Sequence, residues 1–244
     1  MERIENIGFD NLKLIQDDEG FMFGIDAVIL ADFAACMHPG MKKAVDLGTG
    51  NGIIPLILSH KAPGCTVTGF DIQEKAVDMA TRSCDMNNLA DRISFHCCDV
   101  KNIAAEYPEM KGSIDAVITN PPYVAKGSGI VNDKSSKFIA RQETTADIED
   151  FISAAASLLN YKGHLFMVHR PNRLVDIFYY CRKYNLEPKD IRFVAPSEGR
   201  IPNIVLIHSI LGGGHELNYL DTLNVYDKEG NYTAEIVKIY EKTG

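Results

Sequence analysis

Apolar strands alternate with amphipathic helices from residue 43 onward, and this alternation is the feature that most constrains the fold. The strand segments are continuous runs of apolar and β-branched residues, as expected for strands buried on both faces of a sheet. They are KAVDLG (43–48), CTVTGFDI (65–72), ISFHCCD (93–99), IDAVITN (114–120), HLFMVHR (164–170) and DIRFVAP (190–196). Helical patterns separate most of them, which predicts an α/β fold with a doubly wound, mostly parallel, seven-stranded sheet.

The segments outside this alternation predict small additions to a single domain over residues 1–244. Residues 1–40 are expected to hold a hairpin that turns near Asp17–Gly20, followed by a helix over Gly24–Met37. Residues 41–211 would form the core, and residues 212–244 a β-hairpin and a short helix. A Thr-x-x-Asp pattern at Thr144–Asp147 predicts the capping box of a core helix.

Targeting and membrane segments are not evident in the sequence. No apolar stretch follows a basic N-terminus, and no run approaches the roughly 20 apolar residues of a membrane span. The 6 cysteines form no C-x-x-C pair, and no Cys/His spacing resembles a metal site. We therefore expect a cytoplasmic protein with free thiols, no bound metal and no membrane partner.

Charge is distributed unevenly along the chain. The formal net charge of −8 taken alone argues against a nucleic-acid partner. Residues 1–122 hold 10 Lys/Arg and 18 Asp/Glu, whereas residues 123–244 hold 15 of each kind. Any basic surface must therefore come from the second half of the chain.

A glycine-rich loop follows the first core strand. The segment DLGTGNG places Gly48, Gly50 and Gly52 between a strand and a helix, where a backbone without side chains lets a ligand approach closely. The next two strands end on Asp71 and Asp99. Ligands of this fold type bind at the carboxyl ends of the strands, and a carboxylate at Asp71 is suited to two ribose hydroxyls.

This loop predicts S-adenosylmethionine as the ligand. Its spacing is G-x-G-x-G, one residue shorter than the G-x-G-x-x-G fingerprint of dinucleotide sites. Asp46 precedes the loop, and a carboxylate suits the sulfonium and amino groups of S-adenosylmethionine better than it suits a pyrophosphate. A nicotinamide dinucleotide, and with it an oxidoreductase, is the alternative.

These motifs resemble those of class I S-adenosylmethionine-dependent methyltransferases, and residues 41–211 would be their cofactor-binding and catalytic core. DLGTGNG matches the first motif of that family, FDI the acidic ribose motif and CCDV the adenine-contacting motif. The resemblance implies that Asp99 meets the adenine amino group with Val100 beside it, and that Ile72 packs on the adenine ring. It also implies that Phe23 and Gly24 lie over the cofactor pocket.

The segment NPPY, which is Asn120, Pro121, Pro122 and Tyr123, resembles the [DNS]-P-P-[YFW] motif of methyltransferases that act on sp² amines. Such an amine is a poor nucleophile because its lone pair is delocalised. The side-chain oxygen of Asn120 and the carbonyl of Pro121 would accept hydrogen bonds from the NH₂ group. The prolines would hold these two acceptors rigidly. Tyr123 would offer a stacking face, and Asn120 would also border the cofactor. Neither a strong general base nor a metal is required.

The chain resembles, over nearly its full length, a bacterial family of tRNA adenine-N6 methyltransferases that modify A37 of a valine tRNA. The matching segments include FGIDAVILADF (23–33), ARQE (140–143), VHRPNRL (168–174) and NVYDKEGNYTAEI (224–236). The resemblance implies a tRNA partner whose anticodon-loop adenine is splayed out to reach Asn120. We expect a monomer or a weak dimer.

Basic side chains that follow NPPY are the candidates for contacts with RNA. The Gly/Ser/Lys-rich segment 124–142 reads as a lid or a phosphate clamp, with a solvated loop as the alternative. Arg170 and Arg173 follow a strand end, where they can meet either phosphate or helix carboxylates such as Asp176. The predicted substrate-binding side chains are therefore those of Tyr123, Lys126, Lys134, Lys137, Arg141, Arg170 and Arg173.

Other functions share parts of this pattern. A protein glutamine-N5 methyltransferase also uses NPPY, but such enzymes usually carry an N-terminal helical domain, and only about 40 residues precede the first motif here. A DNA adenine methyltransferase would be expected to carry a target-recognition domain. A non-catalytic module that binds S-adenosylmethionine is the alternative from a different functional class.

Overall fold

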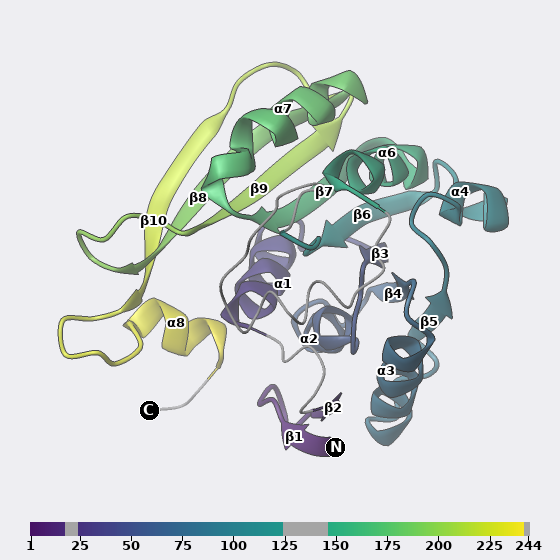
Figure 1. The fold of residues 1–244 in the computed structure, drawn as a ribbon, viewed down its shortest axis with the longest axis horizontal. Coiled ribbons are helices and arrows are strands. Elements are labelled where there is room, and N and C mark those ends of the chain that lie inside the picture. Colours follow the sequence, from purple (N-terminus) through teal and green to yellow (C-terminus); the bar gives the residue numbers. More distant parts are fainter. Residues whose placement is uncertain (18–23, 124–145, 242–244) are drawn as a thin grey trace.

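The computed structural model describes residues 1–17, 24–123 and 146–241, and a sheet of 8 strands forms its centre (Figure 1). The strand order is β10-β8-β9-β7-β6-β3-β4-β5, so the chain winds outward from β3 in both directions. The strands are β3 (Lys43–Leu47), β4 (Thr66–Asp71), β5 (Ile93–Cys97), β6 (Ile114–Thr119), β7 (Leu159–His169), β8 (Leu186–Ser197), β9 (Ile204–Leu211) and β10 (Asn218–Tyr226). The predicted doubly wound α/β fold is confirmed.

Strand β9 is antiparallel to both of its neighbours, and the other pairings in this sheet are parallel. The sheet has one strand more than the predicted seven, because β10 pairs in parallel with the end strand β8. The predicted terminal hairpin is consequently short, with a single antiparallel bridge between Tyr226 and Tyr232. Asp227 closes its turn by accepting the backbone N–H groups of Glu229 and Asn231 at 3.0 and 2.9 Å.

Helices cover both faces of the sheet. In Figure 1, α1 and α2 lie on one side of it, and α6 and α7 lie on the other. The helices are α1 (Ile25–Met37), α2 (Ile53–Lys61), α3 (Glu74–Met86), α4 (Ile103–Glu106), α6 (Ile148–Leu158), α7 (Leu174–Lys183) and α8 (Ala234–Ile239), with 3-10 turns η1 (Pro108–Met110) and η2 (Pro171–Arg173). Helix α8 contacts α1 and β10.

The side chains of β6 show why the strand runs read as apolar without a break. Ala116 and Ile118 belong to the core cluster that includes α1 and α2. Val117, between them, belongs to the second cluster with α6 and α7. Successive side chains of a strand point to opposite faces, so a strand covered on both faces buries apolar side chains at consecutive positions.

The N-terminal hairpin differs from the predicted one. Strand β1 (Glu2–Asn6) pairs antiparallel with β2 (Lys13–Asp17), so the chain turns between these strands and not near Asp17–Gly20. The turn uses Phe9, Asp10 and Asn11 at positive φ. The prediction failed because asparagine and aspartate also support left-handed turn conformations, and the Asp-Asp-Glu-Gly segment was the stronger signal in the sequence.

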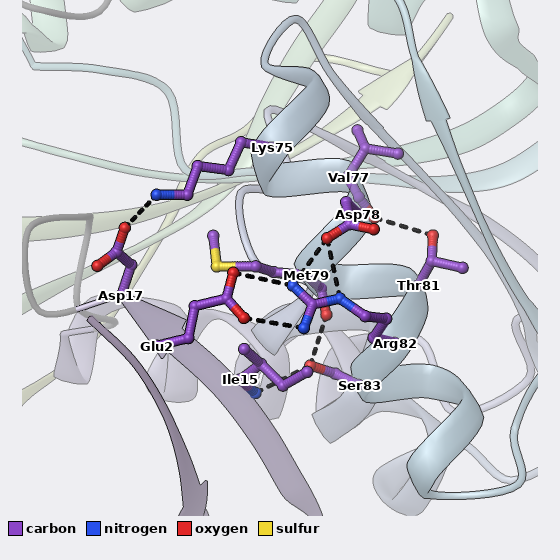
Figure 2. A network of polar contacts seen from close by, with 10 residues as sticks. All are labelled: Glu2, Ile15, Asp17, Lys75, Val77, Asp78, Met79, Thr81, Arg82 and Ser83. Carbon is purple, nitrogen blue, oxygen red and sulfur yellow. Dashed lines mark hydrogen bonds and ion pairs between the residues drawn. The ribbon is translucent and has the colours of Figure 1, made fainter.

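Polar contacts attach this hairpin to α3 (Figure 2). Arg82 on α3 contacts Glu2 with both terminal nitrogens at 2.8 and 2.9 Å, and it also pairs with Asp78. The backbone N–H of Ile15 donates to Ser83 at 2.9 Å, and Lys75 pairs with Asp17. The hairpin is thereby held beside the core although it pairs with none of its strands.

The capping box of α6 lies three residues later than predicted. Asp147 is the N-cap, and its carboxylate accepts the N–H groups of Glu149 and Asp150 at 3.0 and 3.3 Å. Asp150 in turn accepts the N–H of Asp147 at 2.9 Å. Both Thr-x-x-Asp and Asp-x-x-Asp fit the pattern, and the helix takes the second. Thr144 lies outside the described residues.

The carboxyl ends of the central strands meet at one edge of the sheet. Leu47 is in register with Phe70 on one side and with Thr119 on the other. The glycine-rich loop, Asp71 and NPPY follow directly from these three positions. The edge between β3 and β6, where the winding direction changes, is therefore the place for a ligand site.

Candidate active site

Backbone hydrogen bonds join the glycine-rich loop to the end of β4. The N–H groups of Gly48 and Thr49 donate to the carbonyl of Phe70 at 2.8 and 2.9 Å. The N–H of Gly50 donates to Oδ2 of Asp71 at 2.8 Å, and Oδ1 accepts the N–H of Gln73 at 2.9 Å. Each carboxylate oxygen keeps a further lone pair, so Asp71 remains able to accept ligand hydroxyl groups.

Two glycines of the loop serve different purposes. Gly52 has a φ of +83°, and a Cβ there would lie 2.8 Å from the Phe95 ring and 3.0 Å from Ala80. Gly50 has a φ of +54°, but a Cβ there would meet nothing within 4 Å among the described residues. Gly52 is therefore required by packing, whereas Gly50 faces open space that a ligand can fill.

Buried polar atoms beside the loop lack partners. Asp46 is fully buried, yet neither of its carboxylate oxygens has a hydrogen-bond partner within residues 1–17, 24–123 and 146–241. The hydroxyl of Thr49 and the amide nitrogen of Asn51 are also buried and unpaired within those ranges. Buried polar groups are normally satisfied, so this cluster is arranged for polar groups of a ligand. Sequence reasoning identified Asp46 and missed Thr49 and Asn51, the polar residues between the glycines.

Burial dominates the electrostatics of both acidic residues. It raises the pKa of Asp46 to about 7, with the nearby Thr49 hydroxyl opposing the shift and the Asp71 carboxylate adding to it. The Thr49 hydroxyl is close enough to act on that pKa, although no hydrogen bond of acceptable geometry joins the two side chains. Burial also raises the pKa of Asp71, against the lowering effect of the N–H donors from Gln73, Gly50 and Ile72. A bound cation would favour the charged form of both carboxylates.

The predicted adenine-binding residues line the next part of the edge. Ile72 is 39 % exposed although it is a large apolar side chain, and Val100 is buried. Asp99 accepts the N–H of Lys101 at 3.0 Å and pairs with the ammonium of Lys101 at 3.3 Å. Ile72 and Asp99 follow the ends of the paired strands β4 and β5, and an apolar side chain and a carboxylate at neighbouring strand ends suit a base with an amino group.

NPPY lies at the end of β6, and its last residue contacts α1. The phenol oxygen of Tyr123 lies 2.6 Å from Oδ2 of Asp26 and 3.0 Å from Oδ1 of Asn120. Asp26 is in the first turn of α1, two residues after the N-cap Gly24. A carboxylate is favourable near the start of a helix. The contact of Asp26 with Tyr123, 97 residues away, carries no local signal.

The two predicted arginines have different surroundings. Arg170 places its guanidinium 4.8 Å from the centroid of the Tyr123 ring and donates to the carbonyl of Asn203 at 3.0 Å. His169 contacts the same ring edge-on at 5.0 Å, and burial lowers the pKa of His169 to about 4, so its imidazole is neutral. Arg173 pairs with Asp176 at 2.7 Å. Arg170 thus lies against Tyr123 of NPPY, whereas Arg173 meets a helix carboxylate, the second of the two predicted possibilities.

Several predicted site residues are not among those that the structure describes. Phe23, Lys126, Lys134, Lys137 and Arg141 fall in the segments 18–23 and 124–145. Within the described ranges, no helix is both long and apolar enough to cross a membrane. Those same ranges contain no cluster of three or more His, Cys, Asp or Glu side chains that could hold a metal ion.

Comparison with known protein families identifies the class of site. A family model described as "Methyltransferase small domain" matches residues 29–177, which is more than half of the chain. The chain belongs to this methyltransferase family. The matched segment contains the glycine-rich loop, both acidic strand ends and NPPY.

Individual relatives agree with this assignment. A curated relative from Porphyromonas gingivalis, "tRNA1(Val) (adenine(37)-N6)-methyltransferase", is 27 % identical over 96 % of this chain and 92 % of its own length. Among solved structures, a predicted O-methyltransferase from Agrobacterium tumefaciens has a TM-score of 0.72 at 21 % identity, covering 88 % of this chain and 95 % of its own. Geranyl diphosphate C-methyltransferase from Streptomyces coelicolor, solved with S-adenosyl-L-homocysteine, has a TM-score of 0.55 at 15 % identity, covering 75 % and 77 %. These structural similarities concern the fold.

The side chains of this methyltransferase fit S-adenosylmethionine. The unpaired Asp46 carboxylate suits a cationic ligand, and the open space at Gly50 lets the backbone approach it. Asp71 has lone pairs for ribose hydroxyls, and exposed Ile72 offers an apolar surface for the adenine ring. A dinucleotide pyrophosphate would instead place negative charge near Asp46, which disfavours it.

Proposed function

We propose that this methyltransferase transfers a methyl group from S-adenosylmethionine to the exocyclic N6 of an adenine in RNA, namely A37 in the anticodon loop of a valine tRNA. The observation that carries the proposal is the position of NPPY at the end of β6, beside the strand that leads into the glycine-rich loop. The name of the Porphyromonas gingivalis relative, which aligns over 96 % of this chain, supports the choice of substrate.

The proposed chemistry depends on orienting a weak nucleophile. When bound, S-adenosylmethionine supplies an electrophilic methyl group on its sulfonium. The oxygens of Asn120 and Pro121 accept hydrogen bonds from the adenine NH₂ and aim its lone pair at that methyl carbon. A C–N bond forms as the S–CH₃ bond breaks, and the nitrogen releases a proton to solvent afterwards.

The adenine must leave its stack to reach this edge of the sheet. An anticodon-loop base is already unpaired, so its extrusion costs little. Arg170 lies over the Tyr123 ring at 4.8 Å, so a stacked adenine would use the opposite face of that ring. We assign contacts with RNA phosphates to Arg170 and to the basic side chains of segment 124–142, namely Lys126, Lys134, Lys137 and Arg141.

A protein glutamine-N5 methyltransferase would also use NPPY, but the full-length relative supports the RNA substrate.

The test uses two valine tRNA transcripts that differ only at position 37, one with A and one with G. Incubation with labelled donor and the purified protein should label only the A37 transcript. Equal labelling of both transcripts would overturn the assignment of the position, and labelling of a protein substrate instead would favour the glutamine reaction.

A further inference from the structure

The phenol of Tyr123 lies between two oxygen acceptors. It is 2.6 Å from the carboxylate of Asp26 and 3.0 Å from the carboxamide oxygen of Asn120. A phenol has one proton and can donate it to only one of the two. The carboxylate is the stronger acceptor, and its shorter distance is typical of a charge-assisted O–H···O⁻ bond.

Tyr123 keeps its proton in this setting. Burial raises the pKa of the Tyr123 phenol, and the adjacent Asp26 carboxylate raises it further, against a smaller opposing effect of Arg170. The phenol is therefore a neutral donor at any pH at which the protein would work. Where that proton points then determines whether the oxygen of Asn120 is free.

We propose that Asp26 is a positioning residue that draws the Tyr123 proton away from Asn120, so that the Asn120 oxygen stays free to accept the substrate amine. This inference rests on the proposed role of Asn120 in methyl transfer. Without Asp26, the phenol would donate to Asn120 across the existing 3.0 Å gap. A donor there would occupy a lone pair of the oxygen and place a hydrogen where the amine N–H must approach.

The proposal predicts that the effects of two substitutions on kcat are not additive, because the hydroxyl of Tyr123 blocks the Asn120 oxygen only when Asp26 is absent. Asp26→Ala should lower kcat about tenfold or more, which corresponds to the loss of about one oriented hydrogen bond. Tyr123→Phe should cost less, about threefold, since Asn120 then has no competing donor. The double variant Asp26→Ala/Tyr123→Phe should match Tyr123→Phe alone and so exceed Asp26→Ala.

A second variant and two further readouts separate positioning from a loss of structure. Asp26→Asn keeps an oxygen acceptor and should fall between wild type and Asp26→Ala. The affinity for S-adenosylmethionine by calorimetry and the KM for tRNA should each change by no more than about twofold, so the effect should fall on kcat. Asp32→Ala is the matched control, because it removes a carboxylate paired with Lys61 from the same helix.

The outcomes distinguish this inference from the proposed function. No N6-methyladenosine from the wild-type protein would overturn the proposed function itself. With an active wild-type protein, unchanged turnover in Asp26→Ala would overturn the role of Asp26. A double variant less active than Tyr123→Phe would overturn it too, because a purely structural role does not depend on the Tyr123 hydroxyl.

Discussion

The backbone N–H of Gly50 donates to Oδ2 of Asp71 at 2.8 Å, which joins two sequence motifs 21 residues apart. The loop that approaches the ligand and the carboxylate assigned to the ribose are therefore positioned by each other. Asp71 also accepts the N–H of Gln73, so a change at this side chain affects the loop and α3 together. The cofactor half of the site behaves as one unit.

Asp71→Asn should weaken binding of S-adenosylmethionine by about tenfold or more, a loss of roughly 1.4 kcal/mol or greater. The N–H groups of Gly50 and Gln73 donate to different oxygens of Asp71, and an amide replaces one of these oxygens with an NH₂ group that would face an N–H donor. Titration calorimetry of the purified variant measures the change. Asp91→Asn, which alters an exposed carboxylate, is the control and should bind like wild type. Undiminished affinity in Asp71→Asn would show that the ribose contact lies elsewhere.

Asp46 should make the stability of the free protein depend on pH. Its pKa is raised from 3.8 to about 7, so the folded state holds this proton more tightly than the unfolded state. The free energy of unfolding therefore falls as the pH rises from 3.8 to about 7, by roughly 4 kcal/mol at most. Urea unfolding between pH 4 and 8 should show this loss in wild type and not in Asp46→Asn. The same pH profile in both proteins would contradict the assignment.

The cofactor should offset this loss, because a cationic ligand stabilises the charged carboxylate of Asp46. Added S-adenosylmethionine should raise the unfolding midpoint of wild type more at pH 8 than at pH 5. Asp46→Asn should show a smaller rise that varies little with pH. Thermal unfolding with and without the ligand measures both effects.

Gly52→Ala and Gly50→Ala should separate packing from ligand binding. A Cβ at Gly52 would lie 2.8 Å from Phe95, so this change should destabilise the free protein by about 2 kcal/mol or more. A Cβ at Gly50 meets no described atom within 4 Å, and its cost should be about 1 kcal/mol from backbone conformation alone. Gly50→Ala should nevertheless lose affinity for S-adenosylmethionine. Urea unfolding and calorimetry together test the pair, and normal binding by Gly50→Ala would contradict a ligand at that position.

Neutralising the basic residues of segment 124–142 should weaken RNA binding and leave cofactor binding unchanged. The variant replaces Lys126, Lys134, Lys137 and Arg141 with Gln. If each contacts a phosphate, the slope of log K for tRNA against log salt should become shallower by about 0.7 per residue. Filter binding over a salt series measures the slope, and calorimetry checks the cofactor. An unchanged slope would assign RNA binding to other surfaces.

The core was predictable because its signals are local. Continuous apolar runs identified β3, β4, β5 and β6, and glycine spacing identified the loop between β3 and α2. Acidic residues at strand ends then fell at one edge, since parallel strands end together. Each of these signals lies within a few residues of the feature that it predicts.

The features that the sequence did not predict depend on contacts between distant segments. The Tyr123–Asp26 pair spans 97 residues, and nothing near either residue indicates the other. The parallel pairing of β10 with β8 depends on the position of β9 between β8 and β7. Thr49 and Asn51 were passed over because a polar residue between glycines is common in turns, and only burial without a partner marks them as part of the site.

The central claim is that NPPY presents an adenine amino group to S-adenosylmethionine, and nucleoside analysis tests it most directly. Unmodified bulk tRNA would be incubated with labelled donor and either wild type or Asn120→Ala, and then digested to nucleosides. We predict labelled N6-methyladenosine with wild type, and a loss of about 100-fold or more in rate with Asn120→Ala while calorimetry still detects cofactor binding. Label in any other nucleoside, or none in RNA, would contradict the account.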